Sequence, residues 1–262
     1  MAASTSETAI TASESESSES EIHIGWHYDF IEVGTSDYST ITHYCAHDEC
    51  KASCIGSEIW SNLDDLSWAR GLAVDPVLDN LNALPDLPRV QKVEAAMDEY
   101  SGESQFYFVS QENITKYLGE YTSCFGQHDD SWSVDVMWYA GALGSLGKPH
   151  PNLEYMLESV GRLDLLDRKI VQVHNWGSLC KSFHVRTADV VQLDCEGKDC
   201  AILRSMLRHY DDDYDLPRVV AFEANHLTPH EEVDDTLRLL DDRGYRLRFQ
   251  SNWNAIVERD WQ

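Results

Sequence analysis

The sequence predicts an α/β protein with a mainly parallel sheet, helices on both faces and an antiparallel hairpin at the C-terminus. Short runs of β-branched and aromatic residues alternate with amphipathic segments, as in repeated βαβ units. Near the end, "YRLRFQ" (245–250) and "NAIVER" (254–259) flank "SNW", which is typical of a hairpin. The chain has 262 residues, of which 42% are hydrophobic, enough to fill an ordinary core.

The strands are predicted from apolar runs bounded by turn residues. We expect "SQFYFV" (104–109) to be an additional strand that pairs at an edge. The principal strands, in chain order, are "YDFIEV" (28–33), "RGLAVD" (70–75), "RVQKVEAAM" (89–97), "DVVQLD" (189–194) and "RVVAFEA" (218–224).

Two helices follow from apolar residues at helical spacing, over 199–210 and over 230–243, where Gly244 ends the second. Two other segments interrupt the alternation. Residues 45–68 lengthen the first crossover, and residues 110–150 are rich in Gly, Trp, Tyr and His. Long insertions in compact domains are usually functional or disordered, and the aromatic content of the second favours an ordered cap.

Residues 1–21 are small and acidic and almost lack large apolar side chains. Such a segment buries too little surface to offset its ordering entropy, so we expect a disordered tail. Residues 22–262 are predicted to form a single domain.

The charge of the chain restricts its partners. Lys and Arg total 20 against 46 Asp and Glu, a formal net charge of -26. This charge repels nucleic acids and anionic membranes, and a small molecule is the expected partner. The first basic residue is Lys51, and the N-terminus has no signal-peptide pattern, which predicts a cytoplasmic protein. Seven cysteines suggest free thiols, and the oligomeric state stays open.

The end of the first strand, "FIEVGTSD", is the expected ligand site, because open parallel sheets bind ligands at the carboxyl ends of their strands. It has one glycine, Gly34, where a dinucleotide requires three, and Asp37 would repel phosphates. A cofactor with a ribose and cationic groups but no phosphate, S-adenosylmethionine, fits better. Glu32 and Asp37 would bind its ammonium, Gly34 would allow a close approach, and Asp75 would accept the ribose hydroxyls.

Each of these acids also has a structural interpretation. Glu32 and Asp75 can be solvated strand ends, and Asp37 can be a helix N-cap. A nicotinamide cofactor is the weaker alternative, and the chain contains no G-x-x-x-x-G-K-[ST] loop for a nucleoside triphosphate.

Several segments together resemble the FkbM-type methyltransferases: "DFIEVGTSD", "GLAVDP", "VEAAMDEYSGESQFYFV", "LGSLGKPHP", "DVVQLDCEGKDCAILRSM" and "PRVVAFEANHLT". The resemblance runs from about Asp29 to Arg259, and "LDCEGKDCAIL" is its most specific part. It implies a class I, Rossmann-like fold, S-adenosylmethionine as methyl donor and a hydroxyl oxygen as acceptor.

The resemblance also implies roles for individual residues. It places Ala95 and Ala96 near the adenine, and Asp194 and Glu196 beside the methyl group and the acceptor. In this chain Ser36, Asp37 and Tyr38 stand where a second glycine is common in the family. A noncatalytic binding or scaffold protein with a degraded motif is therefore the alternative function. The implied cofactor-binding residues are Glu32, Gly34, Thr35, Ser36, Asp37, Asp75, Ala95, Ala96 and Asp194.

Catalysis would consist mainly of alignment, with Asp194 as the base and Glu196 as an orienting or acceptor-binding group. The structural interpretation of "DCEG" is a capping turn at a helix start. Three loop histidines, His150, His174 and His226, are rival bases.

Two further groups of residues are candidates for other roles. Tyr121, Trp132, Trp138 and Tyr139 are candidates for an acceptor lid or for plain aromatic packing. The stretch "HYCAHDECKASC" offers zinc ligands, but its spacing does not repeat a C-x₂-C knuckle. We therefore expect free thiols there and no metal. The potential ligands in this stretch are His43, Cys45, His47, Cys50 and Cys54.

Overall fold

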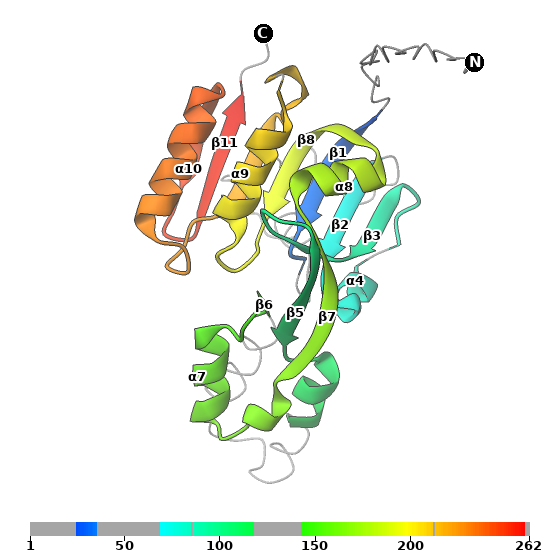
Figure 1. Ribbon diagram of the computed structural model, residues 1–262, viewed down its shortest axis with the longest axis vertical. Coiled ribbons are helices and arrows are strands. Elements are labelled where there is room, and N and C mark those ends of the chain that lie inside the picture. The colour runs from blue at the N-terminus through cyan, green and yellow to red at the C-terminus, as the bar shows by residue number, and fades with distance from the viewer. Residues whose placement is uncertain (1–24, 36–68, 85, 118–142, 212, 260–262) are drawn as a thin grey trace, which may run out of the picture.

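The structure is a computed structural model that describes residues 25–35, 69–84, 86–117, 143–211 and 213–259. These residues form two sheets, one of seven strands and one of four (Figure 1). The large sheet has the order β10-β11-β9-β8-β1-β2-β3. Its strands are β1 (Trp26–Val33), β2 (Gly71–Asp75), β3 (Val90–Glu94), β8 (Val185–Leu193), β9 (Val219–Glu223), β10 (Tyr245–Gln250) and β11 (Asn254–Arg259).

The large sheet is parallel from β3 to β9. β1 pairs with β2 on one side and with β8 on the other, and β8 pairs with β9. β11 runs antiparallel to both β9 and β10. The chain therefore adds strands outward from β1 in both directions, and the strand order reverses between β1 and β8. The predicted fold class, including the C-terminal hairpin, is confirmed.

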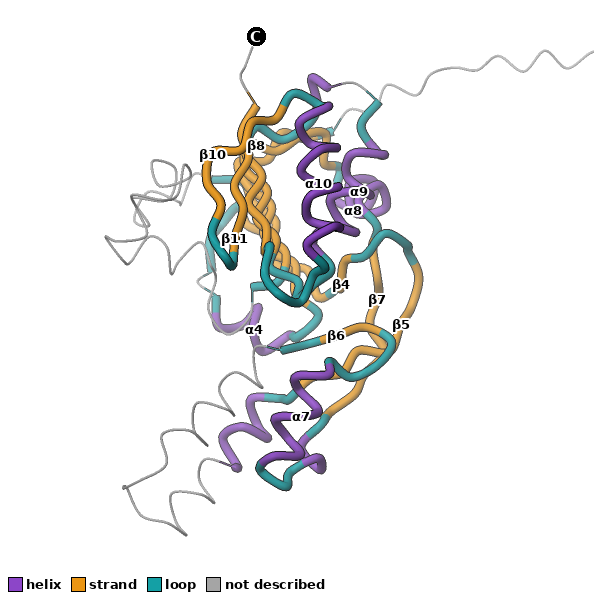
Figure 2. Tube along the Cα trace, turned by 90° about the vertical axis from the view of Figure 1, so that its left-hand side faces the viewer, coloured by secondary structure: helices purple, strands orange, loops and turns teal. Residues whose placement is uncertain are grey.

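Helices cover the sheet on one face through α8 (Trp176–Phe183), α9 (Asp199–His209) and α10 (His230–Asp242), as Figure 2 shows. α4 (Leu78–Ala83) lies on the other side, in the crossover from β2 to β3. Neighbouring residues of β1 pack in different clusters, with Ile31 beneath the three helices and Phe30 on the opposite face. The strand is thus buried on both faces, as a central parallel strand should be.

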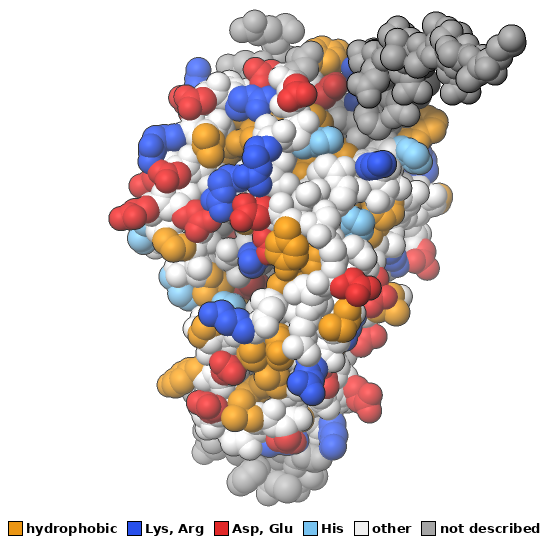
Figure 3. All heavy atoms as spheres, viewed as in Figure 1, with side chains coloured by type: hydrophobic (Ala, Val, Ile, Leu, Met, Phe, Trp, Pro, Cys, Tyr) orange, Lys and Arg blue, Asp and Glu red, His pale blue; other side chains and the backbone are white. Residues whose placement is uncertain are grey.

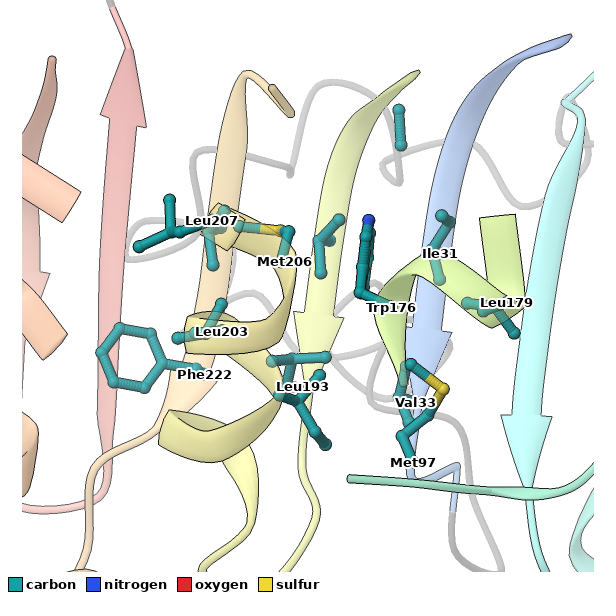
Figure 4. Close-up of a cluster of buried hydrophobic side chains, with 14 of the residues drawn as sticks. Ile31, Val33, Met97, Trp176, Leu179, Leu193, Leu203, Met206, Leu207 and Phe222 are labelled. Carbon is teal, nitrogen blue, oxygen red and sulfur yellow. The ribbon is translucent and has the colours of Figure 1, made fainter. Parts of the chain in front are cut away.

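The main core lies between the sheet and helices α8 and α9. Trp176, at the start of α8, is fully buried, and its backbone N–H donates to Ser205 Oγ of α9 at 3.0 Å. Strand side chains meet the helices here because alternate residues of each strand point to this face. Figure 4 labels Ile31, Val33, Met97, Trp176, Leu179, Leu193, Leu203, Met206, Leu207 and Phe222 in this cluster.

The four-stranded sheet belongs to a lobe, described over residues 96–117 and 143–174, that extends away from the large sheet (Figure 1). Its long pair is β5 (Gly102–Phe108) with β7 (Asp167–His174), which are antiparallel. The short strands β4 (Ala96–Met97) and β6 (Ser145–Leu146) complete the sheet. Helix α7 (Pro151–Ser159), the 3-10 helix Leu163–Leu165 and helical residues 111–117 surround a separate small core.

Two predicted strands differ from the structure. The predicted strand 89–97 is broken at Ala95, whose N–H donates to Asp75 O at 3.2 Å and Val93 O at 3.0 Å, and the chain then leaves the large sheet as β4. The predicted edge strand 104–109 pairs with β7 and β6 in the second sheet. The predicted tail 1–21 and insertion 45–68 lie outside the described residues. Among the helices that the structure describes, none is long and apolar enough to cross a membrane.

Candidate functional site

The carboxyl ends of β1 and β8 meet at Gly34. Asp194 N–H donates to Val33 O at 2.9 Å, and Gly34 N–H donates to Val74 O at 2.9 Å. Gly34 has a φ of +80°, and a Cβ there would lie 1.9 Å from Asp194 O. Only glycine fits such a position. The end of the neighbouring strand β8 therefore requires glycine at position 34, independently of any ligand that also approaches there.

Asp75, at the end of β2, is buried and accepts hydrogen bonds from four donors of the described residues. Its Oδ2 accepts from Thr35 N at 2.9 Å and from Thr35 Oγ1 at 3.2 Å, and its Oδ1 accepts from Val77 N at 2.7 Å and Asn80 Nδ2 at 3.2 Å. A carboxylate has about four acceptor positions. Asp75 thus joins the end of β1 to the start of α4, and a ribose hydroxyl would have to replace one of these donors.

The other predicted cofactor residues lie around the same strand ends. Glu32 and Thr35 are buried, and Glu32 lies in the sheet between Ala73 of β2 and Gln192 of β8. Ala95 and Ala96 are also buried, Ala95 in the main core and Ala96 in the core of the second sheet. Ser36 and Asp37 lie outside the described residues. The cofactor roles of this set stay predictions.

Three carboxyl groups come together after β8 and at the end of β9. Asp194, Glu196 and Glu223, which we name the carboxylate cluster, each place one oxygen within 4.8 Å of the other two. Burial, and then the charge of Asp199, raises the pKa of Asp194 to about 7. Burial and the neighbouring carboxylates likewise raise the pKa of Glu196 to about 8 and that of Glu223 to about 10. The cluster therefore attracts protons or another cation.

Asp199 holds the backbone segments that carry the carboxylate cluster. It is the first residue of α9, is fully buried, and accepts hydrogen bonds from Cys195 N at 3.2 Å and Glu223 N at 3.2 Å. Burial raises its pKa to about 6, although these N–H groups lower it. Asp199 therefore ties the loop after β8 to the end of β9.

The turn between β8 and α9 has an unusual backbone. Glu196 has a φ of 50° and Gly197 a φ of 87°. A left-handed conformation is uncommon for a residue other than glycine, and it persists where the surroundings fix it. The turn leads the chain from Asp194 to Lys198, the N-cap of α9, and then to Asp199, the first residue of the helix. Lys198 makes no side-chain capping hydrogen bond at the start of α9, and the acidic site stays a prediction.

Of the three candidate histidines, His150 and His226 interact electrostatically with each other, and His174 is the last residue of β7. His150 caps α7, its Nδ1 accepting from Asn152 N at 3.2 Å, and burial followed by the charge of His226 lowers its pKa. His226 lies edge-on to Trp253, with ring centroids 6.1 Å apart. His174 Nδ1 lies 3.0 Å from Ser178 Oγ at the start of α8, and burial lowers its pKa. His226, close in the chain to Glu223, is the histidine nearest in sequence to the cluster.

Glu223 was not predicted as a site residue. "FEAN" was noted only as part of the resemblance, although Glu223 ends the strand next to β8 and so lies at the same sheet edge as Asp194. Asn225 Nδ2 donates a short hydrogen bond to Glu223 Oε1, and Asn225 Oδ1 accepts from Leu227 N at 2.8 Å, which fixes the glutamate. The predicted lid aromatics (Tyr121, Trp132, Trp138, Tyr139) and the zinc alternative (His43, Cys45, His47, Cys50, Cys54) lie outside the described residues.

No family model and no curated protein matches the chain. Among solved structures, the chain is similar to the structure of the O-methyltransferase NovP, with 12% sequence identity and a TM-score of 0.33 over 89% of this chain and 72% of that one. The strand order and pairing given above define the fold independently of this likeness.

Proposed function

We propose that the chain is an S-adenosylmethionine-dependent methyltransferase of the FkbM type that methylates a hydroxyl of a small molecule or sugar. One observation carries the proposal: acidic side chains gather at the carboxyl ends of the strands where strand order reverses. That crevice is the general ligand site of open α/β sheets. The resemblance of the sequence to this family supports the same function.

The residues at this edge fit the cofactor by their chemistry. Asp75, Asp194 and Glu196 are acids, and the described turn after β1 has one glycine in place of a phosphate cradle. Acids suit a ligand with an ammonium and no phosphate. When bound, S-adenosylmethionine supplies a methyl group on a positively charged sulfur. Asp75 and Thr35 would hold the ribose end, after Thr35 Oγ1 or Asn80 turns away from the carboxylate.

The protein's contribution to the reaction would be alignment and proton acceptance. Holding two reactants in line can lower a barrier by about 7–11 kcal/mol. During methyl transfer, a carboxylate oxygen of Asp194 would accept the hydroxyl proton of the acceptor. Glu196 would orient the acceptor. The acidic chain favours a neutral or cationic acceptor in the cytoplasm over nucleic acid or membrane lipid.

Calorimetric titration of the full chain with S-adenosylmethionine tests this proposal. We expect saturable binding that is at least about tenfold weaker in Asp75→Asn, since loss of the charged oxygens costs about 1.5–3 kcal/mol per charged hydrogen bond. Asp86→Asn, an exposed acid paired with Lys92, is the matched control. Circular dichroism shows whether each variant is folded.

A second arm follows turnover. Incubation with cell extract and cofactor should yield a product heavier by one CH₂, and Asp194→Asn should slow its formation without abolishing cofactor binding. Saturable binding of NAD in place of S-adenosylmethionine contradicts the proposal.

A noncatalytic binding protein of the same fold is the second candidate. The observation that favours it is the full set of protein donors around Asp75, which satisfies that carboxylate without a ligand. A folded wild-type chain that binds neither S-adenosylmethionine nor S-adenosylhomocysteine decides for this candidate.

A further inference from the structure

We propose that Trp253 forms a platform that binds a sugar ring, and that this ring carries the hydroxyl group of the acceptor. The link to the acceptor rests on the proposed function, whereas the binding of the ring does not require S-adenosylmethionine. In the sequence, Trp253 belongs only to the "SNW" turn of the predicted hairpin. Its position beside the candidate site follows from the pairing of the strands.

The hairpin turn lies at the same edge of the large sheet as the candidate site. β11 is antiparallel to β9 and begins where β9 ends, with Asn254 paired to Glu223. Ala224 N–H donates to Trp253 O at 2.7 Å. Trp253 is therefore next to the end of β9, and β9 in turn pairs with β8. Open α/β sheets bind their ligands at this edge.

The Trp253 side chain is exposed although its backbone is held firmly. Ser251 Oγ accepts from Trp253 N at 3.1 Å and from Asn254 N at 3.0 Å, and Ser251 N donates to Asn254 O at 2.9 Å. The side chain is nevertheless 60% exposed. A ligand that binds to a preorganised group loses little affinity to the ordering of the protein. A large aromatic ring on such a turn is therefore suited to binding.

Two histidines lie near this ring. His226, in the loop after β9, is edge-on to Trp253, with ring centroids 6.1 Å apart and an angle of 84° between the planes. This T-shaped contact favours one orientation of the indole. Burial, and then the charge of His226, lowers the pKa of His150 at the start of α7, so the two histidines are close to each other. A ligand on Trp253 would therefore also be near the lobe.

The side chains around the indole favour a sugar ring as the ligand. Ser251 and Asn252 precede Trp253, Asn254 follows it, and the exposed His226 borders it. Hydroxyl, amide and imidazole groups donate and accept hydrogen bonds, as the hydroxyls of a sugar do. The C–H face of a sugar ring can pack on the indole while its hydroxyls reach these polar groups. A ligand that is apolar on all sides would leave the polar groups without partners.

Two other exposed aromatic side chains lack this combination. Trp26 lies at the amino end of β1, and the Arg70 guanidinium covers its ring at 4.5 Å from the centroid. Tyr214 is exposed but precedes β9, at the opposite end of that strand from Trp253. Among the described residues, no Lys or Arg stacks on Trp253. Tyr214 is therefore a suitable control for exposure alone.

Titration of the full chain with methyl pyranosides, followed by saturation-transfer NMR, tests the proposal. The probes are the methyl glycosides of glucose, galactose, mannose, rhamnose and N-acetylglucosamine. We expect saturable binding of at least one probe, with an affinity at least about tenfold lower in Trp253→Ala, as for other aromatic residues at the centre of a binding site. Trp253→Phe keeps an aromatic face and should bind within about threefold of the wild type. Tyr214→Ala should leave the affinity unchanged.

Four results would overturn the proposal. Three are the absence of saturable binding of every probe by the folded wild type, unchanged affinity in Trp253→Ala, and an equal loss in Tyr214→Ala. The fourth uses phenol as an aromatic probe: if phenol binds through Trp253 more tightly than every pyranoside, the platform binds aromatic rings and the sugar class is wrong. Because no arm uses S-adenosylmethionine, sugar binding without cofactor binding refutes only the proposed function, and the reverse result refutes only the sugar platform.

Discussion

At the scale of single residues, Gly34, Asp75 and Asp194 hold the ends of β1, β2 and β8 together. Gly34, Asp75 and Asp194 all lie at the expected strand ends, because strand ends can be identified from local patterns. Their contacts could not be predicted, since they depend on partners far away in the chain. Thr35 and Asp75 are joined across 40 residues, and Glu223 joins Asp194 only when β9 lies beside β8.

Gly34 provides a prediction at this scale. Gly34→Ala combines a positive φ with a Cβ placed 1.9 Å from Asp194 O. We expect it to lower the free energy of unfolding by clearly more than about 1 kcal/mol, the usual cost of alanine at such a φ. Urea denaturation measures the loss.

Gly147→Ala is the matched control for this variant. Gly147 has a φ of +79° and nothing within 4 Å of the added Cβ, so only the backbone cost applies. Equal losses in the two variants would show that the strand ends move apart freely and that the contact with Asp194 does not constrain the site.

At the scale of elements, local pattern and final structure agree where one face of an element packs on the large sheet. Helix α9 and the C-terminal hairpin were predicted almost to the residue for this reason. β7 and α8 were not predicted. β7 exposes Arg168, Ile170 and Gln172 on its outer face, so its apolar pattern is weak, and it pairs with β5, which lies far earlier in the chain. α8 has only eight residues.

Trp176 tests whether the unpredicted α8 stabilises the whole fold. Its side chain is fully buried between α8 and the sheet. Trp176→Ala should lower the free energy of unfolding by about 3–5 kcal/mol, the range for removing a large buried aromatic side chain. Trp253→Ala, whose side chain is 60% exposed, should change it by no more than about 0.5 kcal/mol. Denaturation followed by circular dichroism compares the two, and similar small losses would mean that α8 docks weakly.

At the scale of the whole molecule, the topology of the large sheet was the most predictable property, and the net charge follows directly from the composition. The sequence predicted the sheet, its hairpin and the interruption between residues 110 and 150, but not that this interruption belongs to a lobe with its own sheet and small core. Figure 3 shows that acidic and basic side chains are interspersed on the face in view, even though the net charge of the chain is -26. The excess of acid is therefore not one continuous patch on that face.

The net charge gives a prediction for the whole molecule. Like charges destabilise a compact state, and salt screens them over about 10 Å at 0.1 M. With EDTA present, raising NaCl from about 0.01 M to about 0.15 M should therefore raise the melting temperature. Scanning calorimetry measures the shift. A melting temperature that falls with NaCl would mean that the ion pairs of the described surface outweigh the net repulsion.

The break at Ala95 has a consequence for how this protein can vary. The chain leaves the large sheet there and returns through β7, and its outgoing and incoming strands are hydrogen-bonded to each other, with Ala96 paired to Val173 and Met97 to His174. The two strands that connect the lobe to the large sheet, β4 and β7, are thus hydrogen-bonded to each other at the base of the lobe. Segments beyond this pairing can lengthen, shorten or be exchanged while the ends of β1, β2, β8 and β9 stay in register, so the same candidate site can be combined with different lobes.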